Sequence, residues 1–219
     1  PRTGNELKRF QDAERIILFS HYPQHSCSTS GSSLCDAYRW LKDNSELKNK
    51  ISVIDRWWDR QDYSELWAKL IEKKLCEFTN AHSLNDDDVL VLYSAHSLPE
   101  AYCLEKGDRY NQEIQGSIEN IERKLKELGL QHNHALGWQS KVGPKRTKWL
   151  SPSTPEVIKK SEEKAILIVP IAFTTDHIET LDEIDIEFRE YVEEAGKLFS
   201  RADCFNLESA FIQLCSKLV

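Results

Sequence analysis

A single histidine stands where α/β proteins often carry their functional groups. His96 follows the apolar run 89–93 closely, within Ser94-Ala95-His96-Ser97-Leu98-Pro99, so its imidazole is expected at the carboxyl end of a strand. An imidazole can accept a proton near neutral pH or bind a metal ion. A histidine at a strand end is more often a hydrogen-bonded bystander, so this residue alone decides nothing.

An acidic segment that also carries a histidine is the second candidate. Glu179, Glu183 and Glu187 recur every four residues and would share one stripe of a helix, with Asp176 and His177 just before them. Like charges at this spacing destabilise an exposed helix by about a few tenths of a kcal/mol per pair, which a bound cation would relieve. Carboxylates with one imidazole suit iron or zinc. A solvated acidic face near a helix N-terminus explains the pattern equally well.

Three further features carry weaker signals. Trp138 ends an apolar run and could stack on a flat ligand, although a tryptophan there is more often part of the core. The loop around Gly31 has one glycine and no following lysine, so it lacks the phosphate-binding pattern. The six cysteines show no C-x-x-C pair and no zinc spacing, which is typical of reduced thiols in an intracellular protein.

Short apolar runs alternate with helical patterns along the chain. The expected strands are 15–19, 51–54, 89–93, 135–138 and 165–170. One helix is expected to begin near Leu34. The others are expected at 63–74, 111–128, a long acidic stretch after Asp176, and 207–218. This order predicts an α/β fold with mostly parallel sheets and helices on both faces. Functional groups of such folds lie in loops after the strands, here 20–33, 94–110 and 173–179.

Composition limits the classes of function. The 219 residues are 40% hydrophobic and 30% charged, as expected of a globular protein. The formal charge of -7 and the pI near 5.6 argue against nucleic acid as a partner, because affinity for phosphates comes from clustered Lys and Arg. No apolar run approaches the roughly 20 residues that cross a bilayer. Because the chain opens at Pro1 and contains no methionine, we expect a fragment or a processed form.

Six blocks of the sequence resemble the ferrochelatases. They are Tyr22 to Leu34 (Tyr-Pro-Gln-His-Ser-Cys-Ser-Thr-Ser-Gly-Ser-Ser-Leu), Ile54 to Trp57, Ser94 to Pro99, Gly107-Asp108 with Tyr110, Trp138 to Pro144 with Trp149-Leu150, and Val169 to Glu187. The resemblance implies the chelatase fold, with two Rossmann-like lobes whose parallel sheets are flanked by helices. Residues 1–95 are expected to be the remainder of an incomplete N-terminal lobe, and residues 96–219 the C-terminal lobe, whose last helix can pack back on the first.

The same resemblance implies a role for each candidate residue. His96 is expected to take a pyrrole proton or to bind the incoming metal, with Glu179 as its partner across the pocket. Asp176, His177, Glu183 and Glu187 correspond to an acidic path for metal or protons. The residues that correspond to the porphyrin pocket are Trp138, Ser94, Ser97, Leu98 and Pro99.

The implied activity is insertion of ferrous iron into protoporphyrin IX to form protohaem, the last step of haem synthesis. One alternative is a non-catalytic, ferrochelatase-like protein that binds porphyrin or haem, and another is a related chelatase for a different tetrapyrrole or metal. The family's Gly-Asp-Pro-Tyr-Pro stands here as Gly107-Asp108-Arg109-Tyr110-Asn111, and part of the pocket is expected before Pro1, so the chain alone could be inactive. The presence of both His96 and Glu179 favours an enzyme over a binder.

The resemblance also implies a cofactor, partners and a location. Cys27 coincides with one ligand of the 2Fe-2S cluster of animal ferrochelatases, whose other ligands lie in a tail beyond the position of Val219. Protoporphyrin IX and ferrous iron are the expected binding partners, with homodimerisation and peripheral membrane association as in animal relatives. The expected location is the matrix side of the mitochondrial inner membrane.

Overall fold

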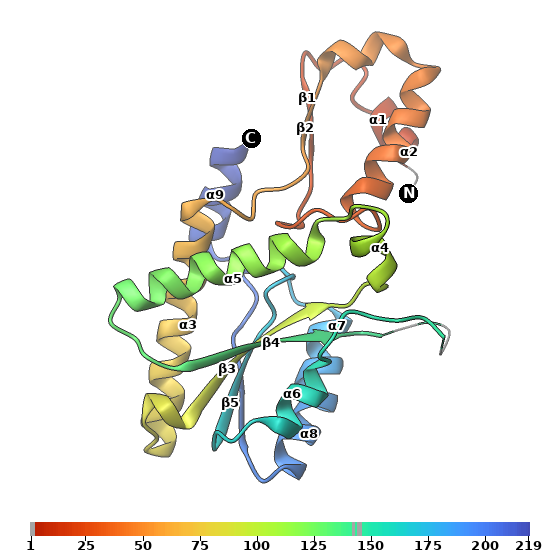
Figure 1. The fold of residues 1–219 in the computed structure, drawn as a ribbon. Coiled ribbons are helices and arrows are strands. Elements are labelled where there is room, and N and C mark those ends of the chain that lie inside the picture. The colour runs from red at the N-terminus through yellow and green to blue at the C-terminus, as the bar shows by residue number, and fades with distance from the viewer. Residues whose placement is uncertain (1–2, 142, 144–145) are drawn as a thin grey trace.

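Two parallel β-sheets organise the chain (Figure 1). The computed structural model describes residues 3–141, 143 and 146–219. A two-stranded sheet pairs β1 (Ile16–Phe19) with β2 (Ile51–Ile54). A four-stranded sheet in the order β4-β3-β5-β6 contains β3 (Val89–His96), β4 (Asn133–Gln139), β5 (Ala165–Val169) and β6 (Leu198–Arg201). Every pairing is parallel, which confirms the predicted α/β class.

Helices flank both sheets and connect their strands. The α-helices are α1 (Thr3–Lys8), α2 (Ser30–Lys42), α3 (Gln61–His82), α4 (Glu100–Leu104), α5 (Tyr110–Glu127), α6 (Thr154–Lys160), α7 (Ile178–Leu181), α8 (Arg189–Glu194) and α9 (Ser209–Leu218). Two short 3₁₀ segments, η1 (Ser45–Lys50) and η2 (Asp86–Asp88), precede β2 and β3, and a π-helix, η3 (Glu183–Phe188), lies between α7 and α8. No helix among the described residues is long and apolar enough to cross a membrane.

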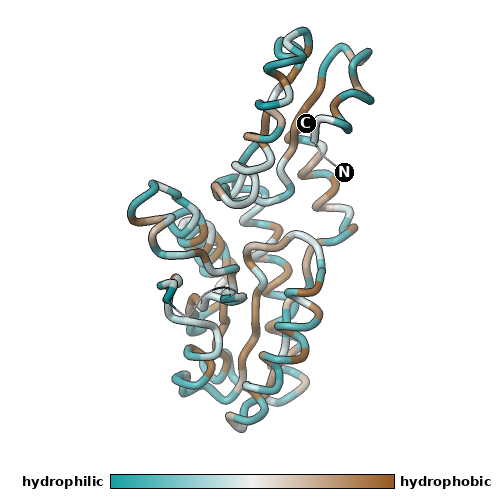
Figure 2. Tube along the Cα trace, turned by 90° about the vertical axis from the view of Figure 1, so that its right-hand side faces the viewer, coloured by the Kyte–Doolittle hydropathy of each residue, from teal (hydrophilic) through white to brown (hydrophobic). Residues whose placement is uncertain are grey.

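The four-stranded sheet is the middle of three layers. Its central strands β3 and β5 are buried along almost their whole length because both of their faces are covered. Val91 and Tyr93 of β3 point to the face covered by α3, α5 and α9, whereas Leu90 and Leu92 point to the face covered by α6, η3 and α8. In Figure 2 the brown, apolar parts of the tube run through the strands, and the outer turns are hydrophilic.

A smaller core lies beneath the two-stranded sheet. It joins Leu7 of α1, Ile16 of β1, Ala37 and Leu41 of α2, and Leu47 of η1. In Figure 1 this part stands at one end of the molecule, above the carboxyl ends of the larger sheet. The loops between the two sheets therefore lie on the edge where α/β folds carry their functional groups.

The chain passes from the two-stranded sheet to the four-stranded sheet before residue 95. Residue 95 is the boundary between the two lobes that was predicted from the sequence. β3 is a central strand of the larger sheet, and Trp57 and Trp67 already belong to the core of that sheet. The change of sheet thus lies between Ile54 and Val89. Alternation of strands and helices does not reveal which sheet a strand joins, so the sequence could not locate this point. The division of the whole chain into two lobes stays a proposal.

The long acidic helix predicted after Asp176 is interrupted. The backbone carbonyl of Asp182 accepts hydrogen bonds from the amides of both Ile186 (2.9 Å) and Glu187 (3.1 Å), and the second of these spans five residues. Such a π-turn is typical of functional sites. The even spacing of the glutamates predicted a regular helix, whereas the structure has a π-helix at Glu183–Phe188.

We predict that Gly137→Ala destabilises the protein and that Gly116→Ala costs less. A Cβ at Gly137 in β4 would lie 2.7 Å from the backbone Cα of Thr154, which cannot move alone. Overpacking of this kind typically costs about 1–3 kcal/mol. A Cβ at Gly116 would lie 2.5 Å from the end of the Trp58 side chain, which can shift, and alanine is favoured over glycine in a helix by about 1 kcal/mol.

The free energy of unfolding of both variants is measured by urea denaturation. Equal losses in the two variants would show that the Thr154 backbone yields as readily as the Trp58 ring.

Candidate active site

The structure brings His96 and Glu179 together across 83 residues of sequence. His96 ends β3, and Glu179 lies in the first turn of α7, which follows the neighbouring strand β5. The His96 Nδ1 lies 2.8 Å from the Glu179 Oε2, within hydrogen-bond reach. The two side chains are 37% and 31% exposed, so the pair faces solvent rather than the core.

The hydrogen bond from His96 lowers the pKa of Glu179, and it outweighs the partial burial of the carboxyl group, which acts to raise that pKa. The Glu179 carboxyl group is therefore ionised at neutral pH. A carboxylate at one ring nitrogen orients the imidazole and stabilises its protonated form. The pair is thus suited to accepting a proton at the other nitrogen, Nε2.

A cavity of about 260 Å³ opens beside this pair. Its lining comes from three distant parts of the chain, namely Tyr22, Gln24, Ser26 and Thr29; His96, Leu98 and Tyr110; and Ala172, Phe173, His177 and Glu179. The aromatic rings of Tyr22, Tyr110 and Phe173 offer flat apolar surface. Pockets for small molecules usually measure about 300–1,000 Å³, so this cavity accommodates part of a large planar ligand rather than all of it.

Two acidic residues hold the loop that forms one side of the cavity. Asp108 accepts hydrogen bonds from the Ser26 hydroxyl (3.0 Å) and from the backbone amides of Cys27 (2.7 Å) and Tyr110 (3.0 Å). Glu113 of α5 accepts the backbone amide of His25 at 2.7 Å. These bonds from charged acceptors fix the loop against α5, because each is stronger than a neutral hydrogen bond.

Some of the residues that line the cavity were predicted only as members of motifs. Tyr22, Gln24 and Ser26 lie in the loop 20–33, and Tyr110 and Phe173 border the other two loops that were singled out. Gln24 is buried and donates to the Ser117 hydroxyl of α5 at 2.9 Å. The position after a strand was the signal that could have identified them, but it does not show which loop residues face inward.

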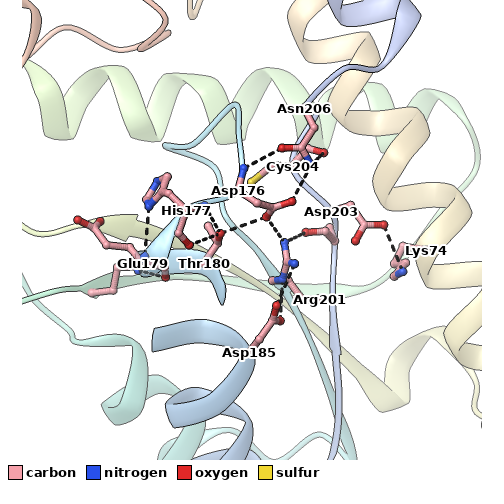
Figure 3. A network of polar contacts seen from close by, with 12 residues as sticks. Lys74, Asp176, His177, Glu179, Thr180, Asp185, Arg201, Asp203, Cys204 and Asn206 are labelled. Atoms are coloured by element: carbon pink, nitrogen blue, oxygen red, sulfur yellow. Dashed lines mark hydrogen bonds and ion pairs between the residues drawn. The ribbon is translucent and has the colours of Figure 1, made fainter. Parts of the chain in front are cut away.

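His177 and Asp176 precede Glu179 but face different surroundings. His177 lines the cavity, its ring packs edge-on against Phe173 at 4.6 Å, and its Nδ1 accepts the backbone amide of Glu179 at 3.2 Å. Asp176 is turned to the Arg201 guanidinium at 2.9 Å and the Asn206 amide at 2.6 Å (Figure 3). Burial acts to raise the pKa of Asp176, but these two partners outweigh it and lower that pKa.

Glu183 and Glu187 follow Glu179 in the π-helix η3 and differ in their surroundings. Glu183 accepts the backbone amide of Ser140 at 2.7 Å and the Gln139 side-chain amide at 3.0 Å. Glu187 is exposed to solvent, and its side chain has no hydrogen-bond partner among the described residues. In residues 3–141, 143 and 146–219, no three His, Cys, Asp or Glu side chains are grouped so that they could hold a metal ion.

Most residues expected to line a porphyrin pocket are absent from the lining of this cavity. Trp138 is 4% exposed and belongs to the core, where its ring centroid lies 6.1 Å from that of Tyr110, and it is not among the residues that line the cavity. Ser94 and Ser97 are buried and bond to Gln139 and Leu150. Of the expected pocket set, Leu98 lines the cavity, whereas Pro99 bridges to Trp149. Val142 and Pro144, from the block around Trp138, lie outside the described residues.

The described residues around Cys27 do not by themselves form an iron–sulfur site. The residue is exposed and all six cysteines are free. Partial burial, together with the charge of Asp108, raises the pKa of the Cys27 thiol. The described part of the chain offers no group of three ligands around it.

The fold and site define an α/β protein of the chelatase class. SirB from Bacillus subtilis, solved with Fe3+, has a similar fold, with a TM-score of 0.60 over 99% of this chain and 76% of that one at 12% identity. The family model of the ferrochelatases matches residues 1–219. Relatives include ferrochelatases from Trichodesmium erythraeum (39% identical, 100% of this chain, 56% of the relative) and Gallus gallus (mitochondrial; 40%, 100% and 54%).

The chain belongs to the ferrochelatase family. It spans about half the length of the curated relatives that it matches.

We predict that the His96–Glu179 pair stabilises the fold in a pH-dependent way. The pKa of Glu179 in the folded protein lies below its ordinary value of 4.5, so its contribution is fully present above that pH and is lost as the pH falls through the lowered value. The free energy of unfolding of wild type and Glu179→Gln should therefore differ near neutral pH and converge in acid.

Urea denaturation from about pH 3 to about pH 7 measures this difference. Glu187→Gln, which alters an exposed glutamate, serves as the control and should show no such convergence. A gap between wild type and Glu179→Gln that stays constant with pH would contradict the pairing.

Proposed function

We propose that this protein inserts ferrous iron into protoporphyrin IX to form protohaem, the last step of haem synthesis. The observation that carries the proposal is the His96–Glu179 pair, whose Nδ1 and Oε2 atoms lie 2.8 Å apart. The pair lies at a cavity lined by the rings of Tyr22, Tyr110 and Phe173. Membership of the ferrochelatase family supports the same conclusion. Iron and porphyrin are substrates here, and the protein's own residues supply the proton transfer and the clamp.

Metal insertion needs a base. The porphyrin loses its two pyrrole protons as the divalent metal enters, so charge is conserved when those protons leave the site. His96 accepts a pyrrole proton or guides the metal, and the Glu179 carboxylate stabilises the imidazolium that forms. Because Glu179 already occupies Nδ1, the free Nε2 is the atom that faces the substrate in this proposal.

Metal insertion also needs a bent macrocycle, since the lone pairs of a flat one lie in the ring plane. Binding energy from the rest of the macrocycle can drive that distortion if the walls are rigid. The loop that contains His25 and Cys27, which we call the wall loop, is held by Asp108 and Glu113. Tyr110 lines the cavity and is buried. These contacts support a clamp that distorts the ring edge lying nearest His96.

A polar path can lead away from the pair. The Gln139 side-chain amide bonds to both the Glu179 carbonyl (3.1 Å) and the Glu183 carboxylate (3.0 Å), and His177 lies on the cavity side. We propose that His177, Glu179 and Glu183 carry protons or metal along this path. Glu187 is a candidate for its exposed end, whereas Asp176 is engaged by Arg201 and serves a different purpose, argued below.

The location and the assembly are proposed from the relatives. Relatives from Dictyostelium discoideum and Gallus gallus are named mitochondrial, while one from Hordeum vulgare is named chloroplastic. We propose a mitochondrial protein associated with the matrix side of the inner membrane, acting as a homodimer. Fractionation of mitochondria with protease protection tests the location.

No observation in the described residues favours the non-catalytic alternative.

We predict that His96→Ala lowers metal insertion by about 100-fold or more, because general-base catalysis typically contributes about 10²–10⁴-fold. The measurement mixes purified protein with protoporphyrin and ferrous iron or zinc and follows the absorbance bands of the metalated product. His82→Ala, at the exposed end of α3, is the control and should keep full activity.

Two outcomes would contradict the proposal. An active, folded His96→Ala variant would remove His96 from the mechanism. Tight porphyrin binding by wild type without any metalation would instead support the non-catalytic binder.

A further inference from the structure

Arg201 holds two aspartates that flank the acidic side of the site. It is the last residue of β6, and its side chain is 10% exposed. Its Nε and Nη2 donate to the two carboxylate oxygens of Asp185 at 2.7 and 3.0 Å, and its Nη1 donates to Asp176 at 2.9 Å. Figure 3 shows the guanidinium lying between the two carboxylates. One planar cation thus uses three donors in a geometry that a lysine cannot reproduce.

The two aspartates lie on either side of the functional segment. Asp176 precedes α7, and Asp185 lies within the π-helix η3. The chain between them carries His177, Glu179 and Glu183, the residues assigned above to the pair and its path. We call residues 176–185 the site segment. Arg201 therefore ties the site segment at its first residue and its last to the end of a strand.

The attachment at Asp176 is reinforced by neighbouring groups. Its carboxylate also accepts the Thr180 hydroxyl at 3.1 Å and the Asn206 amide at 2.6 Å, and Asn206 follows β6. Thr180 is fully buried within α7. The first turn of α7, which carries Glu179, is therefore linked to Arg201 through Asp176.

We propose that Arg201 is a positioning residue that holds the site segment at both ends so that Glu179 stays against His96. The proposal rests on the function proposed above, because it assigns Arg201 to the geometry of that reaction. Arg201 lies outside the cavity lining and acts through Asp176 and Asp185 rather than on substrate. A displacement of about 1 Å in a catalytic group can lower a rate by about 100-fold, so such a tether matters for turnover.

Hydrogen exchange followed by mass spectrometry tests the tether without any substrate. In Arg201→Ala, backbone amides of the site segment should exchange faster, while those of β3 and β5 keep their wild-type rates. Arg201→Lys should recover the protection only partly, because one ammonium cannot serve both carboxylates at once. Arg60→Ala is the matched control: it also loses a two-point contact with an aspartate, Asp62, at 2.9 Å for each bond, but at the start of α3.

Kinetics give the second readout. If wild type inserts metal, Arg201→Ala should lower kcat by about 10- to 100-fold with little change in KM for porphyrin, and Arg60→Ala should change neither. Unchanged exchange in the site segment of folded Arg201→Ala would overturn the proposal. If Arg201→Ala does not fold, Asp185→Asn, which weakens one attachment, decides by the same local change in exchange.

The two proposals fail in different ways. Absence of metal insertion by wild type would refute the proposed reaction, while the exchange experiment would still establish or refute the tether.

Discussion

The candidate site depends on the hydrogen bond between His96 and Glu179, which only the fold brings together. No local feature of the sequence produces this contact. The two residues meet because β5 pairs in parallel beside β3, in a register that sets Tyr93 opposite Val169. The segments that follow both strands therefore leave the same edge of the sheet. The apolar cores on the two faces fix that register, since a shift of one residue would turn the side chains of each strand to the wrong face.

Most carboxylates around this contact are committed to other partners. Asp108 and Glu113 hold the wall loop, Asp176 and Asp185 bind Arg201, and Glu183 accepts the backbone of Ser140. Glu179 is the one acidic side chain among the described residues that lines the cavity. The acidic residues thus hold the backbone around the site in place, and a single carboxylate among the described residues is left to face the cavity.

Sequence reasoning succeeded where the physical cause was local. The strand 51–54 was predicted with its observed bounds, and helix α5 was predicted within one residue at each end, because apolar periodicity reports burial directly. His96 and Glu179 were placed at the right ends of their elements. Trp138 was expected at a ligand wall but is buried in the core, since an apolar residue at a strand end is equally compatible with both. The contact between Asp176 and Arg201 was not predicted, because Arg201 lies 25 residues away on β6.

The π-turn in η3 shows why the periodicity of the glutamates did not predict the form of the helix. Glu183 must reach Ser140 at the end of β4, and Asp185, two residues later, must reach Arg201 at the end of β6. These strands are the two edges of the sheet, so the turn that carries both carboxylates is held from opposite sides. A π-turn is less favourable than an α-turn and persists where the surroundings impose it. Here charge-assisted hydrogen bonds at Ser140 and Arg201 supply that stabilisation. The spacing of charges along a chain predicts a regular helix only when nothing outside the helix binds those charges.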